Sequence, residues 1–364
     1  MSTYIDRITS PTLILNPEIC LRNLKRMYDK AQKLNLRLVP HFKTPQSREI
    51  AQWAKNIGIT ELTVSSVKMA NYLSGQGFDR IHVAFPVNIR EIEQINELAS
   101  RQPLSLQIVN ESAISYLVEN LRQQVSFFIE IDAGYGRAGI RDDDYEKLNN
   151  ILHIADKSDL LHFRGFYIHP GHTYYSNVNE VYVQTLSALT RLKSKYRSRY
   201  PNLVTRVGDT PGCSILDDFG DVDEIGPGNF IFYDLMQVAI GSCTREDIAV
   251  ALAAPIVDID KEYQKILVHG GGVHLSKDFL PTEHGKVFGE AVFLHDNGWR
   301  IPEKMYPVVS ISQEHGTIQV DDSFLDQVQL GDLIGILPVH SCMTADCMKQ
   351  YLTPGVKWID HAEG

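Results

Sequence analysis

Short runs rich in β-branched and other apolar residues alternate with longer amphipathic stretches between residues 1 and 245. The short runs have the length of buried strands, and the longer stretches repeat apolar residues with the spacing of helices. The predicted strands are Arg37–His41, Glu61–Ser65, Arg80–Phe85, Ser105–Val109, Ser126–Asp132, Arg164–His169, Val204–Gly208 and Asp223–Gly226. The predicted helices include Pro17–Leu34, Ser47–Ile57, Ser66–Gly75, Ile89–Ser100, Glu111–Arg122, Tyr145–Ser158 and Val181–Tyr196.

Eight predicted strands, each beside an amphipathic helix, indicate an α/β protein, because such a helix can cover one strand of a parallel sheet. Eight is also the number of repeats that closes a (β/α)8 barrel of the TIM type. An open, doubly wound sheet has the same local pattern and is the alternative.

The pattern changes after about residue 244, where strand-like runs follow one another and long helices are missing. Turn sequences such as Asp296-Asn297-Gly298 separate the runs. We therefore predict a barrel domain over residues 1–245 and a mostly β domain over residues 246–364. The segment Ile8–Leu15 could pair with either domain. The predicted strands of the second domain are Ile248–Ile259, Gln264–His269, Lys304–Ser312, Thr317–Val320 and Asp332–Pro338.

Composition and charge exclude some classes of partner. The chain has 364 residues, of which 43% are hydrophobic and 22% charged, and its formal net charge is −10. Nucleic acids and anionic membranes attract proteins with excess lysine and arginine, so we expect neither as a partner. We also expect no transmembrane helix, because no run of about 18 apolar residues occurs.

The cellular compartment is predicted from the N-terminal segment and the cysteines. Residues Met1–Arg7 lack the charged start and apolar core of a signal peptide. The five cysteines are scattered and odd in number, which fits reduced thiols better than a disulfide framework. We therefore expect a cytoplasmic protein.

The segment Pro40-His41-Phe42-Lys43-Thr44 places a lysine where the first predicted barrel strand ends. Catalytic side chains gather at the carboxyl ends of the strands in α/β barrels. Lysine is also the side chain that forms a Schiff base with pyridoxal phosphate. Lys43 is therefore a candidate cofactor lysine, and the alternative is a surface lysine in a loop.

Two glycine loops follow the seventh and eighth predicted strands. They are Gly208-Asp209-Thr210-Pro211-Gly212 and Gly226-Pro227-Gly228-Asn229. Glycine lets backbone N–H groups approach an anion closely. Because the corresponding loops of many barrels bind phosphate, we predict a phosphate site here, with a pair of ordinary turns as the alternative.

Two further loops carry polar side chains. Arg137 lies among three glycines after the fifth strand, where a planar cation would suit an anionic phenolate oxygen. After the sixth strand, His169 could stack on or bond to a cofactor ring, and His172 could act near a reacting hydroxyl. Tyr174 is a further candidate cofactor contact. The alternatives are a solvated loop arginine and histidines that bond to the backbone.

The mostly β domain contains the pair His340 and Cys342. Residues two apart in a strand face the same way, so the two side chains would project together. Imidazole and thiolate are natural zinc ligands, and two protein ligands would leave positions open for a substrate. The pattern H-x-C also occurs by chance. Cys347 could be a third ligand if a turn brought it back, and Ser312–Gly316 is either a support for the metal or a polar turn.

Together these segments resemble the fold-type III pyridoxal-phosphate enzymes, the alanine-racemase-like barrels. Within them the chain looks like the branch of D-serine dehydratase and D-threonine aldolase. The matching elements run in order along nearly the whole chain: PHFKT at 40–44, DAGYGRAG at 132–139, HPGHTY at 169–174, GDTPG at 208–212, PGNFIFYDLMQ at 227–237, SQEHG at 312–316 and PVHSC at 338–342.

The resemblance implies a site for each part of the cofactor. Lys43 would hold pyridoxal phosphate covalently, and Arg137 would lie beside its phenolic oxygen. The phosphate would be bound by Thr210, Gly228 and Asn229, with Tyr233 close by.

The resemblance also implies a metal and a dimer. His340 and Cys342 would hold a divalent metal that grips the β-hydroxyl of a small D-amino acid, with zinc as the first choice and manganese as the second. Relatives form dimers whose active sites include residues of the partner, so a homodimer is implied by analogy.

The choice within the branch depends mainly on the metal pair. D-Serine dehydratases of this type carry H-x-C, as here, whereas the familiar D-threonine aldolases carry H-x-D. The expected activity is therefore conversion of D-serine to pyruvate and ammonia. The alternatives are cleavage of D-threonine to glycine and acetaldehyde, amino-acid racemisation and non-catalytic binding of the cofactor. One departure from the family pattern is Pro45, where a histidine usually follows, and it affects the expected loop shape and substrate preference.

Overall fold

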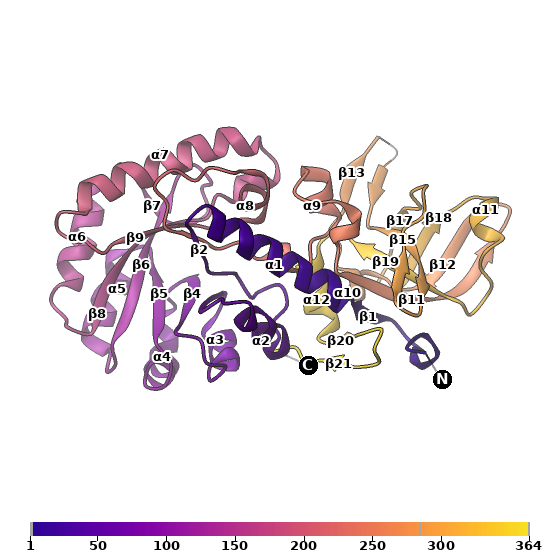
Figure 1. Ribbon diagram of the computed structural model, residues 1–364, viewed down its shortest axis with the longest axis horizontal. Coiled ribbons are helices and arrows are strands. Elements are labelled where there is room, and N and C mark those ends of the chain that lie inside the picture. Colours follow the sequence, from indigo (N-terminus) through magenta and orange to yellow (C-terminus); the bar gives the residue numbers. More distant parts are fainter. Residues whose placement is uncertain (1–2, 284, 363–364) are drawn as a thin grey trace. The chain divides into compact units, whose positions relative to one another are not determined.

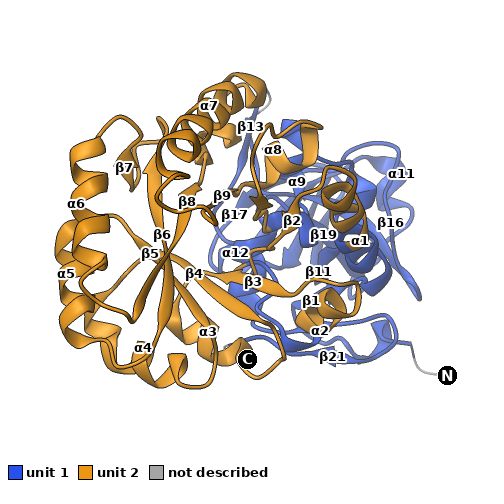
Figure 2. Cartoon of the chain, turned by 60° about the vertical axis from the view of Figure 1, so that its left-hand side comes forward, with its two compact units in different colours: residues 1–24, 44–49, 229–364 blue, residues 25–43, 50–228 orange. Residues whose placement is uncertain are grey.

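The computed structural model describes residues 3–283 and 285–362. The chain divides into two compact units, shown in different colours in Figure 2. The barrel unit comprises residues 25–43 and 50–228, and the β unit comprises residues 1–24, 44–49 and 229–364. The compact units thus divide at residues 228 and 229, whereas the predicted domain boundary lies at residues 245 and 246.

The barrel unit is built on a ring of parallel strands, and all of its residues are described. The strand order is β2-β10-β9-β8-β6-β5-β4-β3, and a parallel bridge between His41 and Thr63 connects the two ends of this series. The predicted eight-stranded barrel is therefore confirmed, and the open sheet is wrong. The bounds are β2 (Arg37–Leu38), β3 (Glu61–Val64), β4 (Arg80–Pro86), β5 (Leu104–Ile108), β6 (Val125–Asp132), β8 (Leu161–Ile168), β9 (Val204–Val207) and β10 (Glu224–Ile225); the short β7 (Ile140–Arg141) pairs with β6.

Helices connect the barrel strands and lie outside them in Figure 2. Several begin at a polar residue whose side chain accepts a hydrogen bond from a backbone N–H of the first turn, as Ser66, Asn110, Asp144 and Asn177 do. Such caps start a helix soon after a strand ends. The bounds are α1 (Pro17–Lys33), α2 (Arg48–Asn56), α3 (Val67–Leu73), α4 (Ile92–Ala99), α5 (Glu111–Asn120), α6 (Tyr145–Ala155), α7 (Val178–Tyr196) and α8 (Thr210–Ile215).

A buried ion network fills the barrel interior near the amino ends of its strands. Arg206 is fully buried, and its Nε donates to Glu224 Oε2 at 2.7 Å. Arg164 donates to both Glu224 and Glu61, at 2.7 and 3.1 Å. Removing one member of such a pair would leave a buried charge uncompensated, at a cost of about 3–5 kcal/mol. The network thus occupies the end of the barrel opposite the carboxyl ends of the strands, where the catalytic residues of such barrels lie.

The β unit contains a large, mostly antiparallel sheet (Figure 1). Strand β1 (Thr12–Leu15) pairs antiparallel with β11 (Val250–Asp260), so the N-terminal strand joins this unit, one of the two alternatives from the sequence. Apolar residues of β11, β12 (Lys265–His269), β18 (His315–Gln319) and β19 (Leu333–Pro338) form its core. The remaining strands are β13 (Leu280–Thr282), β14 (Gly285–Val287), β15 (Gly289–His295), β16 (Gly298–Arg300), β17 (Val308–Ile311), β20 (Tyr351–Leu352) and β21 (Trp358–Ile359).

Helices in the described part of the β unit beyond residue 228 are short, as the sequence indicated. They are α9 (Leu235–Ile240), α10 (Gly272–Leu275), α11 (Asp322–Leu325) and α12 (Ser341–Met348). Across residues 3–283 and 285–362, none of the helices has the length and apolar character needed to cross a membrane.

Candidate active site

A cavity of about 420 Å³ lies at the carboxyl ends of the barrel strands. Lys43 comes from the loop after β2, Arg137 from the loop after β6, and His169 directly follows β8. Three side chains that were predicted separately therefore line one cavity. The full lining is His41, Lys43, Ser65, Ala84, Phe85, Pro86, Glu130, Arg137, Ala138, Tyr167 and His169.

The lining of this cavity fits pyridoxal phosphate. The volume is within the range of cofactor sites, roughly 300–1,000 Å³. Lys43 supplies an amine for covalent attachment, and Arg137 supplies a cation for an anionic oxygen. Glu130 is buried, and its Oε2 has no hydrogen-bond partner among the described residues, so a polar ligand in the cavity would satisfy it. Burial raises the pKa of Glu130, against a hydrogen bond from Gln107 that lowers it.

Two histidines of the cavity are neutral near pH 7. Burial, reinforced by the charge of Lys43, lowers the pKa of His41 well below its ordinary value. Burial also lowers the pKa of His169 to about 3, although a hydrogen bond from its Nδ1 to the carbonyl of Gly208 opposes this shift. Neither ring therefore adds a positive charge to the cavity. His41 was not predicted as a site residue, although it lies in the segment that identified Lys43.

The two glycine loops follow β9 and β10 and lie against each other, as the barrel prediction required. A Cβ atom on Gly208 would come within 2.9 Å of the carbonyl oxygen of Gly226 and of the Tyr167 hydroxyl, so only glycine fits there. Asp209 accepts hydrogen bonds from the N–H of Gly212 at 2.8 Å and from the Thr173 hydroxyl at 2.9 Å. Burial raises the pKa of Asp209 to about 6.

The predicted phosphate contacts of these loops remain predictions. Thr210 is buried at the start of α8. Gly228 ends the barrel unit, whereas Asn229 and Tyr233 belong to the β unit. The Asn229 side chain donates to Asp234 Oδ2 at 2.5 Å and to Ser341 Oγ at 3.2 Å. Tyr233 is buried and has a φ of 50°.

His172 and Tyr174 lie in the 3₁₀ turn Gly171–Tyr174 and are not among the residues that line the cavity. The His172 ring stacks on Tyr135, with centroids 5.9 Å apart and planes at 15°. The Arg137 guanidinium lies 5.1 Å from the centroid of the same tyrosine. Burial lowers the pKa of His172. Tyr135 thus contacts both Arg137 and His172. The catalytic role of His172 stays a prediction.

The pair His340 and Cys342 is not in a strand, so that part of the prediction is wrong. Strand β19 ends at Pro338, His340 caps α12, and Cys342 lies in its first turn. The two side chains nevertheless interact, because a hydrogen bond with Cys342 is one of the causes that raise the pKa of His340. Cys347 lies farther along α12 and forms no group of three metal ligands with them among the described residues.

The surroundings of this pair fit a divalent metal. His340 Nδ1 bonds to Asp278 Oδ2 at 2.9 Å, which leaves Nε2 for a metal, as in carboxylate–histidine–metal arrangements. Burial opposes a charge on His340, but hydrogen bonds to Asp278 and Cys342 outweigh it and raise the histidine pKa to about 11. Imidazole and thiolate held beside a carboxylate are ligands typical of zinc.

Cys342 is held from two further directions. Its Sγ lies 3.0 Å from Oγ1 of Thr44, the residue that directly follows Lys43 in the chain. Asn229 Nδ2 donates to the same sulfur at 3.5 Å. Thr44, Asp278 and Glu130 were not predicted as site residues. The PHFKT motif includes Thr44. The sequence carries no signal for Asp278, whose partner His340 is far away in the chain, or for Glu130, whose burial depends on the fold.

Comparison with known families covers most of the chain. Residues 18–235 match the model of the alanine racemase N-terminal domain, and residues 249–353 match that of a putative serine dehydratase domain. The first match alone spans more than half of the chain.

Curated relatives align along nearly their whole length. D-Serine dehydratase of Dictyostelium discoideum is 27% identical, with 95% of this chain and 93% of the relative covered. D-threo-3-Hydroxyaspartate dehydratase of Delftia sp. strain HT23 is 25% identical, over 94% and 93% of the two chains. D-Threonine aldolase of Arthrobacter sp. is 24% identical, over 92% and 86%.

Solved structures share the fold. A metal-free D-threo-3-hydroxyaspartate dehydratase, in which a cysteine is replaced by alanine, has a TM-score of 0.91 at 22% identity over 100% of both chains. A variant of the same enzyme with a histidine replaced by alanine has a TM-score of 0.90 at 22% identity, over 100% of this chain and 97% of the other. The chain therefore belongs to the alanine-racemase-like, fold-type III pyridoxal-phosphate enzymes, in the branch that carries a serine dehydratase domain.

Proposed function

We propose that the protein is a pyridoxal-phosphate- and metal-dependent lyase that removes the β-hydroxyl group of a small D-amino acid, with D-serine as the preferred substrate. The observation that carries this proposal is that the chain has residues suited to bind the cofactor and residues suited to bind a metal. One is a cofactor-sized cavity containing Lys43 and Arg137, and the other is His340 and Cys342 held beside Asp278.

Lys43 has two tasks in this proposal. Its amine would hold the cofactor, and it would also remove the α-proton of the substrate as a general base. When bound, pyridoxal phosphate supplies the electron sink for the resulting carbanion. Arg137 offers a fixed cation to an anionic cofactor oxygen, and the neutral His169 ring can contact the cofactor without adding a charge.

The task of His340 and Cys342 is to hold a divalent metal, zinc or alternatively manganese. When bound, this ion acts as a Lewis acid that helps the β-hydroxyl group to leave. The relative's two variants support the assignment, because a histidine and a cysteine two positions apart were replaced in them and the cysteine variant is metal-free. His340 and Cys342 have the same spacing. Elimination releases water, and hydrolysis of the released enamine takes up water to give pyruvate and ammonia.

The second candidate is D-threonine aldolase activity, which a relative of 24% identity favours. It would use the same residues, but the β-hydroxyl would lose its proton instead of leaving, and the Cα–Cβ bond would break to give glycine and acetaldehyde. The H-x-C pair supports the dehydratase. The resemblance also supports a homodimer, which the mass of the native protein in solution would test.

A substrate panel tests the proposal. The protein, supplied with pyridoxal phosphate and zinc, is incubated separately with D-serine, D-threo-3-hydroxyaspartate, D-threonine and L-serine. We expect pyruvate and ammonia from D-serine at the highest kcat/KM. Glycine and acetaldehyde from D-threonine as the dominant products would make the protein an aldolase, and D-serine formed from L-serine would make it a racemase.

A chelator arm separates the roles of the metal and the cofactor. Removal of the metal should stop turnover while the visible absorbance of the bound cofactor remains, and added zinc should restore activity. Full turnover after complete metal removal would contradict the role given to His340 and Cys342.

A further inference from the structure

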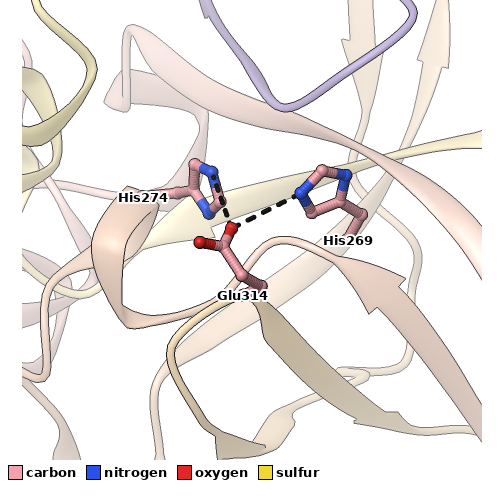
Figure 3. A group of neighbouring side chains, drawn as sticks. All are labelled: His269, His274 and Glu314. Atoms are coloured by element: carbon pink, nitrogen blue, oxygen red, sulfur yellow. Dashed lines mark ion pairs between the residues drawn. The ribbon is translucent and has the colours of Figure 1, made fainter.

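A second group of metal-ligating side chains lies in the β unit. His269 ends β12, His274 lies in α10, and Glu314 lies in the turn between β17 and β18 (Figure 3). Their candidate ligand atoms all lie within 4.8 Å of one another. Within residues 3–283 and 285–362, these three form the one group of at least three His, Cys, Asp or Glu side chains close enough to share a metal ion. It includes neither His340 nor Cys342.

The spacing of these atoms differs from that of hydrogen bonds. Glu314 Oε2 lies 3.5 Å from His269 Nε2 and 3.7 Å from His274 Nε2. A good N–H···O bond joins atoms about 2.7–3.2 Å apart. Ligands about 2.0–2.2 Å from a tetrahedral zinc are separated from each other by roughly 3.4 Å. Figure 3 shows that both imidazoles approach the same carboxylate oxygen, and their distances of 3.5 and 3.7 Å are close to the separation expected around an ion.

The backbone around the group is fixed by three glycines in a row. Gly270 N–H donates to the carbonyl of Glu314 at 2.8 Å, and Gly272 N–H donates to that of Ser312 at 2.7 Å. A Cβ atom on Gly271 would come within 2.6 Å of the carbonyl oxygens of Ser312 and Gln313. Only glycine lets the two segments approach this closely. They are therefore in place before any ion binds, which lowers the ordering cost of binding.

The environment of the side chains allows an ion to enter. The side chains of His269 and Glu314 are 41% and 46% exposed, whereas that of His274 is 15% exposed. Gly271 N–H donates to His274 Nδ1 at 3.2 Å, at the long end of the range. If His274 bound a metal through Nε2, the hydrogen of its neutral ring would be on Nδ1. Nδ1 could then no longer accept the weak hydrogen bond from Gly271.

We propose that His269, His274 and Glu314 form a second divalent metal site, separate from His340 and Cys342. Two imidazoles and one carboxylate select a first-row transition ion such as zinc, and three protein ligands leave one position for water or another small ligand. The ion would link the glycine segment 270–272 to the turn 312–314. This inference does not depend on the proposed lyase activity.

Zinc content tests the proposal. The full chain is equilibrated with zinc and freed of unbound ion, and the metal is measured per chain. We expect Glu314→Gln to hold one equivalent fewer than the unchanged protein, and the more exposed His269→Asn to do the same. The affinity should fall by more than the roughly 10- to 100-fold that loss of an outer-shell partner costs. The matched controls Glu303→Gln and His295→Asn, on exposed residues of the same unit, should keep the full content.

X-ray absorption at the zinc edge identifies which ion is lost. The zinc ion that the unchanged protein holds and Glu314→Gln lacks should have only nitrogen and oxygen neighbours. The Cys342→Ala variant should still hold this ion. Circular dichroism shows whether each variant is folded, and His269→Asn replaces Glu314→Gln if the latter unfolds. Equal zinc content in a folded His269→Asn and in the unchanged protein, or a lost ion with a sulfur neighbour, would overturn the proposal and leave ordinary histidine–glutamate ion pairs.

Discussion

The cavity of the barrel unit and the metal pair of the β unit each contain a half-buried histidine, and the pKa values of the two rings are shifted in opposite directions. Burial disfavours a charged ring in both places. Burial, reinforced by the charges of Arg137 and Lys43, lowers the pKa of His169 to about 3, against a hydrogen bond to the carbonyl of Gly208 that raises it. The pKa of His340 rises to about 11, because Asp278, Cys342 and Asp234 surround it.

This difference shows what each region is suited to bind. The cations of the barrel cavity favour an anionic ligand such as a phosphorylated cofactor. The acidic groups around His340 favour a cation. The two regions can therefore be disturbed separately, and the following predictions test that separation.

The largest effect is expected from Lys43→Ala. The variant should lose the visible absorbance of bound cofactor and several orders of magnitude in kcat, because the attachment point and the base disappear together. Its zinc content should not change. Absorption spectroscopy and metal analysis check both statements, and Lys157→Ala, an exposed lysine of the same unit, serves as the control. Retained absorbance and activity would contradict the assignment of Lys43.

An intermediate effect is expected from Asp278→Asn. The amide cannot hold the His340 ring as the carboxylate does, so metal affinity should fall by about 10- to 100-fold. The visible absorbance should stay, and excess zinc should restore turnover. Asp326→Asn, on an exposed residue of the β unit, is the control. An unchanged zinc affinity, or loss of the cofactor, would break the comparison between the two regions.

The smallest effect is expected from His82→Asn, and it concerns stability. Burial, with the charge of Arg206, lowers the pKa of His82 well below its ordinary 6.5, although a hydrogen bond to Gln107 opposes the shift. The unfolded chain therefore takes up this proton first as the pH falls. The stabilisation from neutral His82 is complete above about pH 6.5 and decreases in more acidic solution.

In His82→Asn, the midpoint of urea unfolding should therefore change less with pH than in the unchanged protein, between about pH 7 and pH 5. The exposed His162, in β8, gives the control His162→Asn, which should keep the original pH dependence. An identical slope in His82→Asn would show that this buried ring does not titrate as inferred.

Much of the fold was predictable from local pattern. The β-rich runs that end at His41, Asp132 and His169 correspond to β2, β6 and β8, because strand length and helix amphipathicity are properties of neighbouring residues. The strands β15 and β16, which flank the predicted turn Asp296-Asn297-Gly298, were missed. The pairing of β1 with β11 could not be chosen, because it joins segments more than 200 residues apart.

Some residues of the candidate site were likewise predictable from the sequence, and others were not. Lys43, Arg137 and His169 were found by their positions at strand ends, and the structure places all three at one cavity. His340 and Cys342 were found by their spacing, but through a strand that does not exist there. Glu130 and Asp278 were missed, because their importance comes from distant partners and from burial.

The sequence by itself determined the alternation of strands and helices, the residue types at the strand ends and the membership of a pyridoxal-phosphate family. Those properties depend on residues close together in the chain. Only the tertiary structure decided which histidines are neutral, which carboxylate holds His340, and that His269, His274 and Glu314 meet. Burial and long-range contacts set the charge and the spacing of these groups, and neither can be read from neighbouring residues.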